Sequence, residues 1–240
     1  MKFDLSNPKT FDSDYFLKLA ITCRHNALVL KDSANLAFQN NHSKNHALFL
    51  LHTSFEELQK GIFCMFVHRG FMSSSQIELI FIKHEAKIIL FEKIFENPTF
   101  SMKKNQFYLD GVLLANLDFQ KLIADNQDFS RKYMGKRNDC LYVRPENNRE
   151  CYTPSKALPD ADEQKREIMD KLTALNSFFD IIWSNDFQGD FDIFSYYKQT
   201  PIGKPETHHV TISGTGIMQK RTNYKPDGYD EFAKKLTSES

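Results

Sequence analysis

The spacing of apolar residues in the first hundred positions most strongly restricts what this chain can fold into. Apolar side chains recur every three or four residues over positions 12–40, which is the period of an amphipathic α-helix. The same spacing returns over 45–68, before Gly70, and over 77–95, before the sequence ENP. Three long helices are therefore expected before residue 100, and they favour a helical bundle.

The second half of the chain shows the helical period in shorter stretches. Further helices are predicted at residues 114–124, 129–143 and 162–183, the second ending at Pro145. Residues 99–113 have no clear period, so we expect a connection with at most a short helical turn. The sequence NNRECYTPSKALPDAD, residues 147–162, contains two prolines and no apolar face, so we expect a loop.

The chain changes character near residue 190. Val210 and Ile212 alternate with polar residues before the turn SGTG, which predicts a small hairpin over 208–221, and DGYDEFAKKL predicts a short charged helix near the end. The expected organisation is an all-α helical bundle over residues 1–190, followed by a C-terminal extension, 191–240, with a hairpin and a short helix.

Charge and cysteine content restrict the partners and the compartment. Lys and Arg number 31 and Asp and Glu number 31, so an anionic partner would have to be held by a local patch, and a histone-like mode is excluded. The apolar stretch 47–67 contains His52 and three charged residues that hydrocarbon would not tolerate, so a buried helix without membrane association is expected. The cysteines form no CxxC pair and the first residues lack an apolar signal sequence, which favours the cytoplasm.

One basic segment, KYMGKRNDCLYVRPENN, stands out in this neutral chain. Between Arg131 and Arg144 five cations face Asp139 alone, which leaves four excess positive charges; the cations are Arg131, Lys132, Lys136, Arg137 and Arg144. Arg and Lys side chains bind phosphate oxygens, and Tyr133 or Tyr142 could stack on unpaired bases. The alternative is a solvated cationic helix face.

Polar residues inside the apolar helices form a second candidate group. Glu56 and Lys60 are four apart, in the favourable order for an ion pair, and His52 lies one turn earlier on that face. His84 and Lys87, three apart, place a titratable and a cationic group on one face of the third predicted helix. Both pairs have two equally good explanations. They could form ion pairs and hydrogen bonds within the core, or they could belong to a site in which Glu56 orients Arg137 while the lysines contact phosphate.

Three motifs in this order resemble a known family. RNDCLYVRP, with Arg137 directly followed by Asn138, is similar to the R-x4-6-H motif of the HEPN superfamily of all-helical proteins, with Tyr142 at the position of the histidine. The arginine followed by L-Y-V resembles the AbiV abortive-infection branch, and SFEELQKG and FIKHEAK resemble that branch in order and spacing. Arg144 departs from the acidic residue that often follows L-Y-V there.

This resemblance implies a HEPN-like bundle with an endoribonuclease site that uses no metal, in a homodimeric toxin of anti-phage defence that a phage-encoded protein could activate. Arg137 would stabilise the phosphorane, with Asn138 and Glu56 beside it. An ordinary tyrosine titrates near 10, so Tyr142 would stack or donate a hydrogen bond, and His84 or a histidine of a second subunit would move the proton. The cationic residues expected to bind RNA are Lys60, Lys87, Arg131, Lys132, Lys136 and Arg144.

A different class of function remains open because the motif histidine is missing. The chain would then be a non-catalytic HEPN-like module that binds RNA, a nucleotide or a phage protein, or the arginine cluster would serve dimer salt bridges alone. No metal ion or cofactor is expected, because phosphate-loop motifs are missing and the pairs His42/His46 and His208/His209 have no further ligand at suitable spacing.

Overall fold

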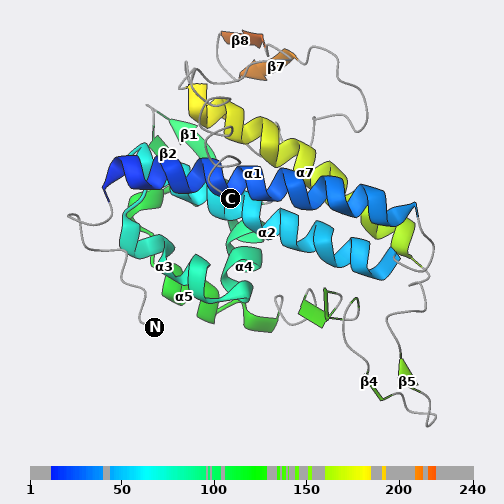
Figure 1. Ribbon diagram of the computed structural model, residues 1–240. Coiled ribbons are helices and arrows are strands. Elements are labelled where there is room, and N and C mark those ends of the chain that lie inside the picture. Colours follow the sequence, from blue (N-terminus) through cyan, green and yellow to red (C-terminus); the bar gives the residue numbers. More distant parts are fainter. Residues whose placement is uncertain are drawn as a thin grey trace.

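The computed structural model describes residues 12–39, 44–95, 97, 99–103, 106–128, 134–135, 137–138, 140, 144–145, 151–152, 160–184, 191–192, 209–212 and 216–219. Three long helices form its centre: α1 (Ser13–Phe38), α2 (Lys44–His68) and α7 (Ala161–Ser184). They run side by side, and three shorter helices lie beyond α2 (Figure 1): α3 (Ser74–Ile82), α4 (His84–Phe95) and α5 (Phe119–Ala124). The predicted helices over 12–40, 45–68 and 162–183 are confirmed, and with them the all-α class.

Close helix packing depends on one glycine in α2. A Cβ atom on Gly61 would lie 3.0 Å from the carbonyl oxygen of Ala20 in α1 and 3.4 Å from the ring of Phe179 in α7. A side chain of any size at this position would push the three helices apart. Gly61 therefore sets the distance at which α1 and α7 meet α2.

The third predicted helix, over 77–95, was expected to be continuous, and this is wrong because the structure divides it into two helices. A capping box between Ser73 and Gln76 starts α3 (Ser74–Ile82), and α4 (His84–Phe95) follows. Between them Lys83 is extended, with φ −118° and ψ 124°. The sequence hides this break because apolar residues recur at helical spacing on both sides of the polar residues 83–85. The change of direction lets both helices pack on α2 and makes His84 the first residue of α4.

The expectation for residues 99–113 is also wrong, because this stretch forms strands. The strands are β1 (Ser101–Lys103), β2 (Gln106–Leu109) and β3 (Val112–Leu113), and β6 (Phe191–Asp192) completes an antiparallel sheet of order β3-β2-β1-β6. Asp110 and Gly111 both have positive φ, 51° and 76°, as a two-residue hairpin turn requires. The dipeptide DG between apolar residues was a local signal for this hairpin.

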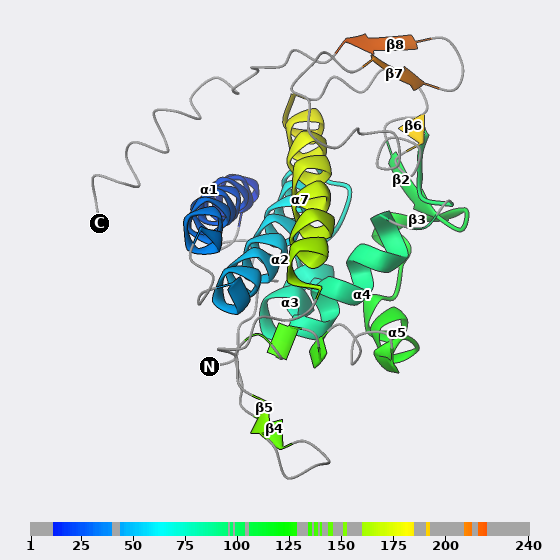
Figure 2. The same ribbon diagram turned by 90° about the vertical axis from the view of Figure 1, so that its right-hand side faces the viewer.

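Phenylalanine rings join this sheet to the helices. Phe107 of β2 lies 4.9 Å, between ring centroids, from Phe66 of α2 and 5.5 Å from Phe100. Phe95 of α4 and Phe178 of α7 are 5.4 Å apart in an edge-to-face arrangement. Figure 2 shows the strands on the same side of α2 and α7 as α4 and α5, with α1 on the other side. One continuous core therefore includes both the bundle and the sheet.

The remaining elements are short. The predicted helix over 114–124 is split by residues 117 and 118 into a 3-10 turn, Leu114–Asn116, and α5 (Phe119–Ala124), which Asp118 caps. Within the helix predicted over 129–143, residues 134–135 and 137–138 are helical. In the stretch expected to be a loop, β5 (Cys151–Tyr152) pairs with β4 (Arg144–Pro145).

The C-terminal part of the structure contains the predicted hairpin. The antiparallel strands β7 (His209–Ile212) and β8 (Gly216–Gln219) confirm it. The short charged helix predicted near the end lies outside the described residues. The division at residue 190 stays a prediction, and β6, just beyond it, pairs with β1.

Candidate active site

A buried carboxylate in the middle of α2 is the centre of the candidate site. The Glu56 side chain is 3% exposed, and three cationic or titratable groups from two other segments of the chain lie close to it. Its Oε1 lies 3.0 Å from Nε of Arg137, while its Oε2 lies 2.7 Å from Nδ1 of His84 and 3.7 Å from Nζ of Lys87. The structure therefore brings together four of the residues singled out in the sequence.

The break at Lys83 explains how α4 reaches this carboxylate. Because α4 begins at His84, both His84 and Lys87 lie in its first turn and on one face. The His84 side chain is 55% exposed, whereas the Lys87 side chain is 3% exposed. The site thus has a closed end at Lys87 and an open end at His84.

The hydrogen bond between Glu56 and His84 fixes the imidazole tautomer. A carboxylate only accepts, so Nδ1 must carry the proton and donate it to Oε2. The Lys87 ammonium, 3.5 Å from the same Nδ1, also only donates and is not its hydrogen-bond partner. The neutral ring then presents an unprotonated Nε2, and the exposed side chain leaves this atom accessible.

Arg137 is held by charge and by an aromatic ring. Its Nε and the Glu56 Oε1 meet as an ion pair without the angle of a hydrogen bond. The guanidinium carbon lies 4.7 Å from the centre of the Phe49 ring, one helical turn from His52 and two from Glu56. Among the described residues no hydrogen bond of its outer guanidinium nitrogens is recorded, and the Arg137 side chain is 11% exposed.

Burial makes the cationic form of Lys87 costly. Removal from water lowers the pKa of Lys87, the attraction of Glu56 opposes this shift in part, and Arg137 lowers the pKa further. One buried carboxylate thus faces two cations and an imidazole. The cluster has an excess of positive charge, as an anion-binding site needs.

The expected pairing of Lys60 differs from the structure. Lys60 forms its ion pair with Glu57, not with Glu56, and its ammonium lies 6.0 Å from the centre of the Phe81 ring. Glu56 is instead turned toward α4 and Arg137, and Lys60 is not among its contacts. His52 is buried on the same face of α2 as Glu56, as predicted.

Sequence reasoning missed two residues here. Phe49 is an apolar residue at helical spacing and gives no sign of contact with an arginine far along the chain. Gln59 is fully buried one turn after Glu56, and neither atom of its amide has a hydrogen-bond partner within the described ranges. A polar residue three positions from Glu56 could have been recognised as part of the polar face.

Part of the predicted basic surface cannot be placed. Asn138 follows Arg137 in the helical segment and is half-buried. Four of the predicted residues lie outside the described residues: Arg131, Lys132, Lys136 and Tyr142. For Arg144 the structure describes the backbone, in β4, but not the side chain. Their contacts with RNA stay predictions.

The described residues contain neither a cluster of metal ligands nor a membrane-spanning helix. No three His, Cys, Asp or Glu side chains gather there as ligands for a metal ion. In the same part of the chain, no helix has both the length and the apolar character that a membrane crossing requires.

The sequence agrees with one known family over most of the bundle. The sequence profile of the AbiV family of HEPN proteins matches residues 16–174, a range that contains Glu56, His84, Lys87 and Arg137. Comparisons with curated proteins and with solved structures give no significant match. Because the matched range covers more than half of the 240 residues, the chain belongs to the AbiV abortive-infection family of the HEPN superfamily.

Proposed function

We propose that this protein is a metal-independent endoribonuclease that acts as a toxin in abortive infection, with the Glu56 cluster as its catalytic centre. The observation that carries the proposal is the buried carboxylate that holds an arginine on one oxygen and an accessible histidine on the other. Buried charges are expensive, so a helix core keeps such a group only where its partners compensate it.

RNA cleavage by internal transesterification needs a general base for the 2′-hydroxyl and a positive charge that stabilises the phosphorane, and the cluster supplies both. The 2′-hydroxyl of the RNA attacks the adjacent phosphorus and gives its proton to Nε2 of His84. Glu56 then stabilises the imidazolium through Nδ1. The bond to the 5′-oxygen breaks, that oxygen takes a proton from water, and the resulting hydroxide takes the proton from Nε2 of His84. The products carry a 2′,3′-cyclic phosphate and a 5′-hydroxyl.

Arg137 stabilises the charge that develops during this step. A guanidinium donates to two phosphate oxygens at once, and Glu56 with Phe49 keeps it oriented before the substrate arrives. Lys87 adds a nearby positive charge from the closed end of the site. Tyr142, near Arg137 in sequence, is assigned base stacking or a hydrogen bond to the substrate.

The product ends of RNA test this function. Purified protein in EDTA should cleave RNA to 2′,3′-cyclic phosphate ends, and Arg137→Ala should lose about 3 kcal/mol of transition-state stabilisation, or roughly a hundredfold in rate. His84→Ala should lose most of the activity while staying folded, because its side chain is 55% exposed. His46→Ala is the matched control, an exposed histidine of α2 outside the cluster.

A second function follows from the missing histidine of the R-x4-6-H motif. If the cluster binds RNA, a nucleotide or a phage protein without reaction, no product ends will form in wild type or in Tyr142→His, while RNA binding still depends on Arg137. Cleavage that is gained or increased in Tyr142→His would instead favour a nuclease with weakened proton transfer.

The remaining proposals concern partners. One subunit offers only a small cluster of cations, so we assign the enzyme a two-fold homodimer in which two such clusters share one cleft. Activation by a phage-encoded protein in the cytoplasm would restrict cleavage to infected cells. Light scattering at micromolar concentration tests the dimer: a monomer with full cleavage activity would contradict it.

A further inference from the structure

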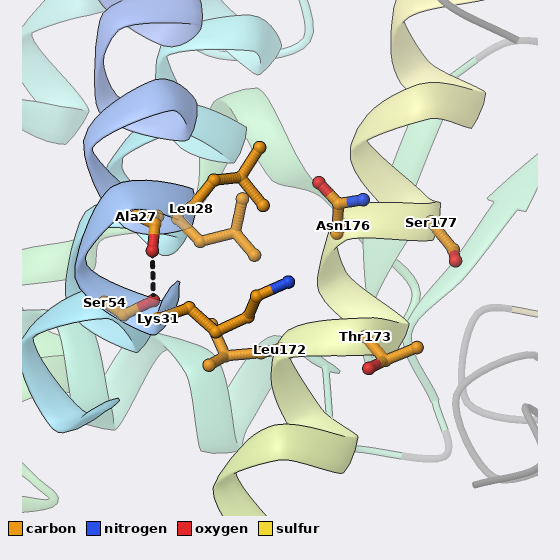
Figure 3. Close-up of a pocket in the computed structure, with 9 residues that line it drawn as sticks. Ala27, Leu28, Lys31, Ser54, Leu172, Thr173, Asn176 and Ser177 are labelled. Atoms are coloured by element: carbon orange, nitrogen blue, oxygen red, sulfur yellow. Dashed lines mark hydrogen bonds between the residues drawn. The ribbon is translucent and has the colours of Figure 1, made fainter. Parts of the chain in front are cut away.

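A pocket between α1, α2 and α7 lies away from the Glu56 cluster. Its volume is about 160 Å³, and its walls are formed by Ala27, Leu28, Lys31, Ser54, Leu58, Leu172, Thr173, Asn176 and Ser177. Ser54 is two residues from Glu56, so the pocket and the cluster occupy different faces of α2. Figure 3 shows the Lys31 side chain extending from α1 toward α7, between Leu172 and Asn176.

Most polar groups of the pocket are already committed to the protein. The Ser54 hydroxyl donates to the carbonyl oxygen of Ala27 at 2.6 Å, and the Thr173 hydroxyl donates to that of Met169 at 2.9 Å. Their protons are therefore not available to a ligand. Ser177 also has an interaction within the protein. Among the described lining residues, the side chains whose donors have no recorded hydrogen bond are Lys31 and Asn176.

The orientation of the Asn176 amide follows from its neighbour. Nε of Arg24 lies 2.8 Å from the amide, and because this N–H can only donate, the atom facing it must be the carbonyl oxygen. The NH2 group of Asn176 is then the uncommitted end. Among the described residues, no acceptor for it is recorded.

The Lys31 ammonium supplies the net charge of the pocket. Arg24 is neutralised by Asp180, at 2.7 Å, whereas the nearest carboxylate to Lys31 belongs to Asp32, at 3.9 Å. That distance is beyond hydrogen-bonding range, and the Asp32 side chain is 73% exposed, so water screens the pair. The pocket thus offers one positive charge and two sets of donors beside a wall in which leucine side chains alternate with hydroxyl-bearing residues.

We propose that this pocket binds a small organic monocarboxylate. Lys31 and Asn176 donate to the two carboxylate oxygens, and the wall of Leu28, Leu58 and Leu172 covers the hydrocarbon part. A cavity of about 150 Å³ holds a benzene ring, so a ligand of that size fits. A single ammonium matches a monoanion better than a phosphate, which carries more charge and has no apolar part.

Benzoate is the probe, titrated into the full-length protein without RNA, so the result does not depend on the nuclease function. Saturable binding is expected, with NMR shifts centred on residues 27–31 and 172–177. Benzamide, the uncharged analogue, and inorganic phosphate should each bind at least about tenfold more weakly. No saturable binding of benzoate, or equal binding of benzamide or phosphate, would overturn the proposal.

Two variants locate the interaction. Lys31→Met keeps the hydrocarbon stem and removes the charge, and Asn176→Asp keeps an oxygen for Arg24 but replaces the free donor by a second acceptor. Both should weaken benzoate binding at least about tenfold. Lys18→Met, at an exposed lysine of the same helix, is the matched control and should bind as wild type does. Unchanged affinity in the two pocket variants, with circular dichroism showing them folded, would refute the assigned roles.

Discussion

Glu56 shows how one side chain organises a site. It lies in a helix whose neighbouring turns are apolar, and its two oxygens have different partners: Arg137 on one, and His84 with Lys87 on the other. A carboxylate at 3% exposure is stable only with such partners, and the partners in turn depend on it. The charge of Glu56 therefore serves both folding and the proposed reaction.

Glu56→Gln tests this double role. The amide keeps the shape but leaves Lys87 and Arg137 without their buried counter-charge, so the free energy of unfolding should fall by about 3 kcal/mol or more. RNA cleavage should also fall, because Nδ1 of His84 loses its anionic acceptor. Urea denaturation and product analysis measure the two effects.

Glu57→Gln is the matched control. Glu57 is the next residue of the same helix, and its pair with Lys60 is more exposed, with the Glu57 side chain at 16%. Its removal should cost no more than about 1 kcal/mol and leave cleavage intact. Equal effects of the two changes would mean that the Glu56 cluster has no special place in stability or activity.

At the scale of elements, the contact of α1, α2 and α7 depends on the missing side chain of Gly61. Replacing an interior glycine by alanine ordinarily stabilises a helix by about 1 kcal/mol. The added Cβ would lie 3.0 Å from the Ala20 carbonyl, a backbone atom that cannot rotate away. The packing cost should exceed the gain in helix propensity.

Gly61→Ala should therefore destabilise the protein, by about 1–2 kcal/mol after the helix-propensity gain is subtracted from the overpacking cost. Thermal unfolding measures the change. Gly135→Ala is the control, because no described atom lies within 4 Å of its added Cβ, and its midpoint should stay the same or rise. A higher midpoint in Gly61→Ala would show that the three helices can separate without cost.

At the scale of the whole molecule, the core keeps thiols away from water. Burial raises the pKa of Cys23 to about 12, against an ordinary value of 9.0, and burial followed by Cys23 itself raises the pKa of Cys64. The folded protein therefore holds protons on these thiols where the unfolded chain has lost them. Both cysteines are free, so alkylation should reach them only after unfolding.

This proton balance predicts how stability depends on alkaline pH. The contribution of Cys23 is complete below pH 9 and is lost as the pH rises from 9 to about 12, because the unfolded thiol ionises first. Cys23→Ala should make the decline of the unfolding free energy over this range less steep. Chemical denaturation at several pH values gives the slopes, and identical slopes in wild type and variant would contradict the prediction.

The sequence by itself determined the helices and the set of candidate residues. Periods of three and four residues identified α1, α2 and α7, because a helix must bury one face whatever it packs against. Charged residues within apolar stretches identified Glu56 and Lys87 as unusual, since charge inside a core needs a partner. Arg137 was identified by the basic segment that contains RNDCLY. The DG turn before β3 was equally local, and its signal was available in the sequence.

Only the tertiary structure decided which groups meet. Glu56 could pair with Lys60 by spacing alone, but Lys60 pairs with Glu57, and Arg137 contacts Glu56 and Phe49 across large separations in sequence. The break at Lys83 likewise falls among polar residues that a continuous helix could also carry on an exposed face, and it is fixed by how α3 and α4 pack on α2. Periodicity records which face of an element is buried, whereas the identity of the neighbour depends on the packing of the whole chain.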